Sequence, residues 1–176
     1  MNLVLNAVLF QCVWFASVAG AGAGYWWAGL PVLALLAAWQ LRVSHWPRAD
    51  AALLASAVLL GFLIDSALAL GGWLSYATPL PFAGLAPAWI VVLWAGFALT
   101  VNHSLAFLKR NFALAVVFGA LGGPLAYLGA ARGFAAVQFE APLLEALLVL
   151  ALAWAVATPL LLRLSTHFVA REGVPA

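Results

Sequence analysis

Charged side chains are scarce in this sequence. Of its 176 residues, seven are basic and five are acidic, whereas 68% are hydrophobic. A water-soluble domain carries about a quarter charged residues, because its surface has to be solvated. The mean hydropathy of +1.13 reflects the same shortage. We therefore expect lipid rather than water to surround most of the chain.

Cysteine and enzyme motifs are also nearly missing. The single cysteine, Cys12, excludes an internal disulfide and a cysteine-based metal site. His45, His103 and His167 lack the spacing of a metal motif, and the chain has no Gly-rich phosphate loop, GxSxG elbow or CxxC pair. We predict no assignable catalytic residue, no metal site and no cofactor. The formal net charge of +2 gives no reason to expect a nucleic-acid partner.

Long apolar runs are what the sequence does contain. They do not alternate as barrel strands do, and they are rich in Ala and Leu. A helix satisfies its own backbone groups in hydrocarbon and needs about 20 residues to cross it. The predicted fold class is therefore all-α, a transmembrane helical bundle that forms a single membrane domain. Six spans are predicted, at residues 3–20, 26–41, 51–72, 88–108, 112–131 and 142–163.

Basic residues are unevenly distributed over the predicted loops. Loops on the cytoplasmic side of a membrane are enriched in Lys and Arg, so this bias predicts the orientation. With a cytoplasmic N-terminus, only Arg132 falls outside. Both termini are therefore expected in the cytoplasm. The first apolar run has no basic residue before it, so we expect a span there rather than a cleaved signal peptide.

An acidic residue within a span is the strongest indication of a site, because its burial in the membrane is costly. Asp65 lies about 22 Å along the third span from Asp50, which is the expected N-cap of that span. Asp65 either forms a binding site or makes a structural hydrogen bond to a neighbouring helix. Glu145 lies near enough to the outer interface to reach water. Together with Tyr127 these carboxylates fall in the outer half, so an outward-facing polar pocket is a hypothesis.

Four uncharged or weakly basic polar residues also lie in predicted spans. Asn102 and His103 are expected about 10 Å from the inner end of the fourth span. Asn6 and Gln11 lie in the first span, about 140° apart around the helix, so they cannot both face one partner. Hydrogen bonds between membrane helices contribute about 0.6 kcal/mol each. Structural contacts between helices are the favoured interpretation for Asn6, Gln11 and Asn102.

The fifth span contains glycines and a proline. Gly119 and Gly123 form a GxxxG pair, which allows two helix backbones to approach closely. Pro124 follows Gly122 and Gly123 and removes one backbone hydrogen bond. Helix packing with a kink is the favoured interpretation. A break that exposes a carbonyl to a ligand, as in transporters, is the alternative.

Two loops are expected on the outer side. The loop at 74–86 contains Pro79 and Pro81, which exclude a regular helix. It is expected either to cover the bundle at the interface or to act as a simple connector. The loop at 132–141 is expected to hold a short turn that ends at Glu140.

Four stretches resemble a known family. They are the opening NAVLFQCVWF, the span that contains Asp65, PAWIVVLWAGFALTVNHSLAFL from Pro87, and GALGGPLAYLGAARG from Gly119. They are similar to the domain-of-unknown-function family 2878, whose members are small multi-pass proteins of the bacterial inner membrane. The resemblance implies that localisation and supplies no catalytic residue. Members are often encoded near enzymes that modify membrane fatty acids, which implies a lipid context.

Three functions follow as hypotheses. The leading one is a non-enzymatic membrane protein that binds or handles a lipid or small hydrophobic molecule, as partner of an enzyme of membrane fatty-acid modification. A small transporter or substrate-binding membrane subunit is the first alternative, with Asp65 and the stretch 122–124 as its site. The second is a membrane enzyme acting on acyl chains, with Asp65 or His103 as acid and base.

Overall fold

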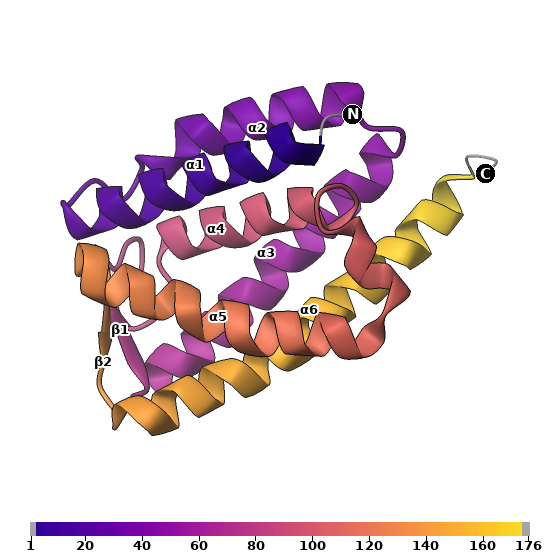
Figure 1. The fold of residues 1–176 in the computed structure, drawn as a ribbon. Helices are drawn as coiled ribbons and strands as arrows, with labels where there is room; N and C mark the ends of the chain where they lie inside the picture. Colours follow the sequence, from indigo (N-terminus) through magenta and orange to yellow (C-terminus); the bar gives the residue numbers. More distant parts are fainter. Residues whose placement is uncertain (1–2, 174–176) are drawn as a thin grey trace.

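The computed structural model describes residues 3–173 and is a bundle of six α-helices over that range (Figure 1). A 3₁₀-helix, η1 (Ala106–Arg110), leads from α4 to α5, and two short strands, β1 (Leu74–Tyr76) and β2 (Val137–Phe139), pair with each other. The predicted helical fold is confirmed. The helices are α1 (Leu3–Gly22), α2 (Gly29–Val43), α3 (Pro47–Leu70), α4 (Ala88–Val101), α5 (Phe112–Phe134) and α6 (Leu143–Glu172).

Four of these helices, α1, α3, α5 and α6, are long and apolar enough to cross a membrane. Their outer faces carry large apolar side chains, such as Leu59, Leu125 and Leu152, that are more than half exposed. In water this surface would be unfavourable at about 25 cal/mol per Å². In lipid it carries no such penalty. The chain is therefore compatible with an integral membrane protein.

Helix α4 is the core of the bundle. It packs against α1, α2 and α3 and also contacts α6, and Figure 1 shows it between these neighbours. Trp89, Trp94 and Leu99 along α4 are almost completely buried. With 14 residues α4 is shorter than a usual span. Because protein rather than lipid surrounds it, its length need not match the hydrocarbon thickness.

A small sheet closes one end of the bundle and was not expected in an all-α fold. Strands β1 and β2 pair antiparallel, with Leu74 opposite Phe139 and Tyr76 opposite Val137. The strands come from the two loops at 74–86 and 132–141, so these loops are joined to each other instead of being separate connectors. In Figure 1 the sheet lies at the end of the bundle away from the start of α1 and the end of α6.

The helix bounds differ from the predicted spans in three places. Helix α4 ends at Val101, so Asn102 is its C-cap and Asn102 and His103 lie beyond the helix rather than inside a span that reaches residue 108. Helix α3 begins at Pro47, a favourable first helical residue, so Asp50 lies in its first turn and is not the N-cap. Helices α1, α2 and α5 begin and end within three residues of their predicted spans.

Helix α6 is nine residues longer at its end than the predicted span that stops at 163. It has 30 residues, about 45 Å at 1.5 Å per residue, and stops where Gly173 adopts φ 69°. The extension has a structural purpose. The Glu172 carboxylate accepts hydrogen bonds from the backbone N–H groups of Arg48 at 3.2 Å and Ala49 at 2.8 Å. It thereby caps the start of α3 from a distant part of the chain.

Candidate functional site

The Asp65 carboxylate lies at the centre of the bundle and is fully buried. Its Oδ1 accepts hydrogen bonds from the hydroxyls of Tyr76, at 2.7 Å, and Tyr127. Its Oδ2 accepts one from the indole Nε1 of Trp94 at 2.7 Å. The donors come from β1, α5 and α4, so the carboxylate of α3 joins four elements. Asp65 faces the interior, and these hydrogen bonds replace water as its solvation.

Burial and the Asp65 carboxylate raise the pKa of the Tyr76 hydroxyl well above its usual value. Tyr76 therefore stays protonated at any physiological pH and remains a hydrogen-bond donor. This matters because both oxygens of the Asp65 side chain accept hydrogen bonds, so the site needs donors that keep their protons. A ring of neutral donors is the arrangement that stabilises such a group without a cation.

Gly61 lies one turn before Asp65, and Gly123 lies one turn before Tyr127; both glycines leave room for a tryptophan. A Cβ at Gly61 would lie 2.0 Å from Cγ of Trp94, and one at Gly123 would lie 2.3 Å from Cγ of Trp154. The two indoles stack on each other with ring centres 4.5 Å apart and an interplanar angle of 13°. The result is a layer of glycine, two tryptophans and glycine that spans α3, α4, α6 and α5. Neither glycine can gain a side chain without displacing an indole.

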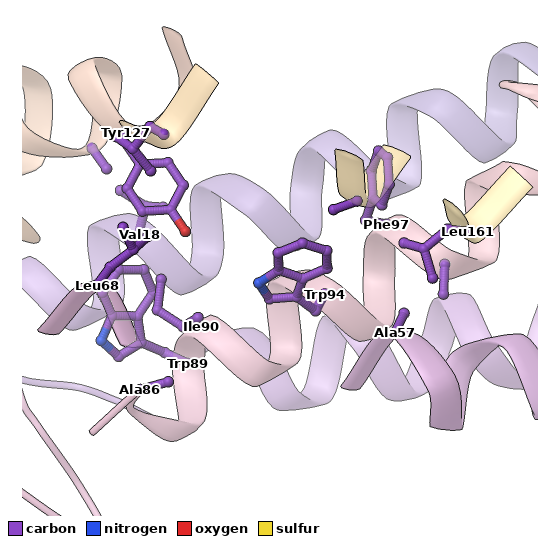
Figure 2. Close-up of a cluster of buried hydrophobic side chains, with 14 of the residues drawn as sticks. Val18, Ala57, Leu68, Ala86, Trp89, Ile90, Trp94, Phe97, Tyr127 and Leu161 are labelled. Atoms are coloured by element: carbon purple, nitrogen blue, oxygen red, sulfur yellow. The ribbon is translucent and has the colours of Figure 1, made fainter. Parts of the chain in front are cut away.

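A cavity of about 420 Å³ lies beside this layer. It separates α4 from α5 and is also bounded by α1, β2 and Trp154 of α6. Its walls are mostly apolar and aromatic, and Tyr127 and Trp94 contribute both to the cavity and to the hydrogen bonds on Asp65. Figure 2 shows the Tyr127 hydroxyl and the Trp94 indole nitrogen turned toward one another. Asp65 itself does not line the cavity.

The fold and this geometry can be set beside known proteins. The family model described as "Protein of unknown function (DUF2878)" matches residues 3–160. The chain belongs to the DUF2878 family. The resemblance inferred from the sequence is thereby confirmed. No curated protein and no solved structure is similar to the chain.

A second polar cluster in this DUF2878 protein lies at the opposite end from the sheet. Asp50 accepts from Asn102 Nδ2 at 2.7 Å and lies 2.8 Å from Nε2 of His103. The Oδ1 of Asn102 in turn accepts from Lys109 Nζ at 2.6 Å and from the Ser165 hydroxyl. The cluster joins α3, the end of α4, η1 and α6. Because α4 ends at Val101, Asn102 and His103 lie beyond the helix. Their side chains contact Asp50 of α3.

Lys109 is the exposed end of this cluster. Desolvation by partial burial lowers the pKa of the Lys109 ammonium, and the nearby Asp50 carboxylate opposes that effect. The Lys109 side chain donates to Asn102, and an ammonium has further N–H groups. It is therefore a link between the buried cluster and the surface at this end.

Asn6 forms a third set of contacts next to that cluster. Its Nδ2 donates to Oε1 of Gln40 at 2.9 Å and to the backbone oxygen of Leu99 at 3.0 Å. Its Oδ1 accepts from the Ser104 hydroxyl at 2.6 Å. Asn6 therefore ties α1 to α2 and α4, as a structural residue would.

Other residues singled out from the sequence lie elsewhere. Gln11 is exposed and borders the cavity, whereas Asn6 is buried, as their different helix faces require. Glu145 is exposed near the start of α6 and does not join Asp65 and Tyr127 in one pocket. His103 lies in the Asp50 cluster and takes no part in the Asp65 site. Among residues 3–173 no three His, Cys, Asp or Glu side chains group as metal ligands would.

The glycine stretch of α5 contains no break. Helix α5 runs through Pro124 to Phe134, so the alternative of a helix interrupted at 122–124 does not agree with the structure. Gly119 and Gly123 both pack on Trp154 of α6, whereas a Cβ at Gly122 would meet nothing within 4 Å. All three glycines border the cavity, but only Gly122 has no contact with α6 at this point.

Sequence reasoning found Asp65 but not the residues that hold it. Tyr76 was assigned to an interfacial loop, and Trp94 was one tryptophan among nine. For Tyr127 the sequence indicates only its depth in the membrane. One signal was present: Gly61 and Asp65, and Gly123 and Tyr127, repeat the same four-residue spacing. That spacing does not tell which helices face each other, so the pairing could not be read from it.

Proposed function

We propose that this protein binds a lipid or small hydrophobic molecule in the cavity between α1, α4 and α5. The observation that supports this is an apolar, aromatic-walled cavity of about 420 Å³ with hydrogen-bonding groups at one place in its wall. Ligand pockets commonly have about 300–1,000 Å³ and the same composition. The Tyr127 hydroxyl donates to Asp65, but its oxygen can still accept a hydrogen bond from a polar group of the ligand. The rest of the wall would contact the apolar part of the ligand.

The packing around the cavity supports a preformed binding site. Gly119 and Gly123 bring α5 onto α6, and the stacked Trp94 and Trp154 hold α5 away from α4. Gly122 leaves the wall without a side chain at the point where α5 faces the cavity. Asp65 stabilises this arrangement through Trp94 and Tyr127. In this proposal Asp65 positions the wall and does not contact the ligand.

We also propose that all six helices cross the bacterial inner membrane and that both termini lie in the cytoplasm. Helices α2 and α4, of 15 and 14 residues, are short for this. The burial of α4 among its neighbours makes a short span acceptable. Most basic residues lie in elements at the end where α1 begins and α6 ends, namely Arg42, Arg48, Lys109, Arg110 and Arg171, whereas Arg132 lies in the last turn of α5. This distribution agrees with the positive-inside rule. A partnership with an enzyme of membrane fatty-acid modification remains a prediction from the family resemblance.

A transporter or substrate-binding subunit that uses Asp65 is the alternative function. Its support is that Asp65 faces the interior of the bundle. Both carboxylate oxygens are already occupied by donors, so a substrate would have to displace a tyrosine or tryptophan first. For an enzyme acting on acyl chains, neither Asp65 nor His103 borders the cavity. Binding is therefore the better-supported function.

The test uses two glycines of the same helix. Gly122→Phe would fill the cavity, whereas Gly133→Phe adds the same side chain at an open position outside the cavity wall. Lipids extracted from the purified wild type and both variants are compared by mass spectrometry. We expect a species enriched over the surrounding membrane in the wild type and in Gly133→Phe, and its loss in Gly122→Phe. No enriched species, or equal enrichment in all three, would refute the proposal.

A further inference from the structure

A second hollow lies toward the basic end of the bundle and shares no lining residue with the aromatic cavity. It has a volume of about 500 Å³ and lies between η1, the start of α5 and the C-terminal half of α6. Lys109 of η1 and Arg163 and His167 of α6 border it. Since Arg163 and His167 are four residues apart on one helix, they project from the same face. We call this hollow the basic groove.

Apolar residues also line the basic groove, namely Leu108, Phe112, Pro159 and Leu162. We call these residues its floor and the three basic residues its rim. The groove therefore combines a cationic rim with a hydrophobic floor. No carboxylate borders it, and within residues 3–173 none of the three basic side chains of the rim forms an ion pair with an acidic residue.

Two of the cationic groups are held in place. The Arg163 guanidinium carbon lies 4.9 Å from the centre of the Phe112 ring, a cation–π contact across the groove from α6 to α5. The Lys109 ammonium donates to Asn102 and keeps N–H groups for another acceptor. The Asp50 carboxylate, which acts on Lys109 electrostatically, is already engaged by Asn102 and His103. Positive charge at the rim is thus held in position without a direct ion pair.

We propose that the basic groove binds the phosphate of an anionic phospholipid headgroup. Lys109 and Arg163 would donate to the phosphate oxygens, with His167 at the side, and the upper acyl chain would lie on Phe112 and Leu162. Basic pockets between membrane helices are suited to such headgroups. A free phosphate ion offers the same charge but would leave the apolar floor empty, so the combination favours a lipid.

This proposal is independent of the aromatic cavity. The two hollows share no residue, and the groove lies at the end of the bundle away from the sheet. Gly122→Phe therefore leaves the groove intact, and substitutions on the rim leave the cavity intact. Either proposal can fail without the other.

The test compares rim variants with a matched control at the same end. The protein is reconstituted in phosphatidylcholine nanodiscs that contain a minor fraction of phosphatidylglycerol, and retained lipids are counted by native mass spectrometry after release. Arg163→Gln with His167→Gln removes two rim groups, and Arg171→Gln removes one charge from the same helix outside the groove. A Lys or Arg beside a bound anionic headgroup contributes about fivefold in affinity.

We expect the wild type and Arg171→Gln to retain phosphatidylglycerol in preference to phosphatidylcholine. The double variant should lose at least about fivefold of this preference, as one cationic group predicts. Circular dichroism spectra that match the wild type show that the variant is folded. Equal retention by the double variant and the wild type overturns the proposal. Arg163-dependent binding of inorganic phosphate, without a preference for phosphatidylglycerol, overturns it in favour of a free anion.

Discussion

Asp65 shows how a carboxylate is accommodated in the middle of an apolar bundle. An isolated charge there would be very costly, and an unpaired one would protonate. Three neutral donors from three elements surround it instead. The group thus serves as an acceptor that orders Tyr76, Trp94 and Tyr127 around one point. Because Trp94 and Tyr127 also form part of the cavity wall, Asp65 contributes both to the stability of the bundle and to the shape of the cavity.

Replacing Asp65 with asparagine keeps the shape of the side chain but replaces one of its two acceptor oxygens with an NH₂ donor. The new amide NH₂ would face donors that expect an acceptor, so at least one buried group loses its partner. That loss destabilises a protein by about 1–3 kcal/mol. We expect Asp65→Asn to unfold at lower temperature than the wild type in detergent, followed by tryptophan fluorescence.

Glu145→Gln is the control for this prediction. Glu145 is exposed, and no hydrogen bond of its side chain occurs in the part of the chain that the structure describes. A surface change of this kind stays within about 0.5 kcal/mol. Equal unfolding temperatures for Asp65→Asn and Glu145→Gln would contradict a structural role for the carboxylate.

At the scale of elements, α5 has two different faces formed by small residues. Gly119 and Gly123 allow α6 to approach, and Gly122 leaves room in the cavity. The GxxxG spacing therefore indicates the two glycines that pack on α6, Gly119 and Gly123, whereas the spacing says nothing of Gly122, which lines the cavity. Pro124 lies within a continuous helix, because neighbouring packing supports the helix where a backbone hydrogen bond is missing.

Alanine substitutions separate these faces. A Cβ at Gly119 would lie 2.2 Å from the backbone oxygen of Trp154, and main chain cannot move aside cheaply. We expect Gly119→Ala to destabilise the protein by about 1–3 kcal/mol through overpacking. Gly122→Ala should be neutral or stabilising by about 0.5–1 kcal/mol, since alanine favours a helix over glycine. Thermal unfolding in detergent distinguishes them, and equal destabilisation by both would contradict the assignment of the faces.

At the scale of the whole molecule, the two ends of the bundle are closed in different ways. One end has the two-stranded sheet with Glu140, whose Oε1 accepts from the Ser75 hydroxyl at 2.5 Å. The other has the Asp50 cluster and the Glu172 cap on α3. The aromatic layer and the cavity lie between them. The even number of helices places the start of α1 and the end of α6 at the same end (Figure 1).

The proposed orientation can be tested with single cysteines. Cys12 is replaced by serine, and cysteine is introduced at Ala83 in the loop before α4 or at Ala170 near the end of α6, both exposed positions. A membrane-impermeant maleimide added to intact cells should label Ala83→Cys only. Ala170→Cys should be labelled only after the membrane is opened. The reverse pattern would show that the termini lie outside.

The amino-acid sequence by itself determined that this chain is made of long apolar helices and that Asp65 is buried. Both follow from composition and local periodicity, because twelve charged side chains cannot solvate a domain of this size and a helix satisfies its own backbone. The choice of partners for Asp65, the central place of α4 and the cavity beside Tyr127 were decided only by tertiary structure. Each depends on which helix faces meet and on loops that pair across the bundle. Such contacts join residues far apart in the chain, and a nearly uniform apolar surface gives little indication of them in advance.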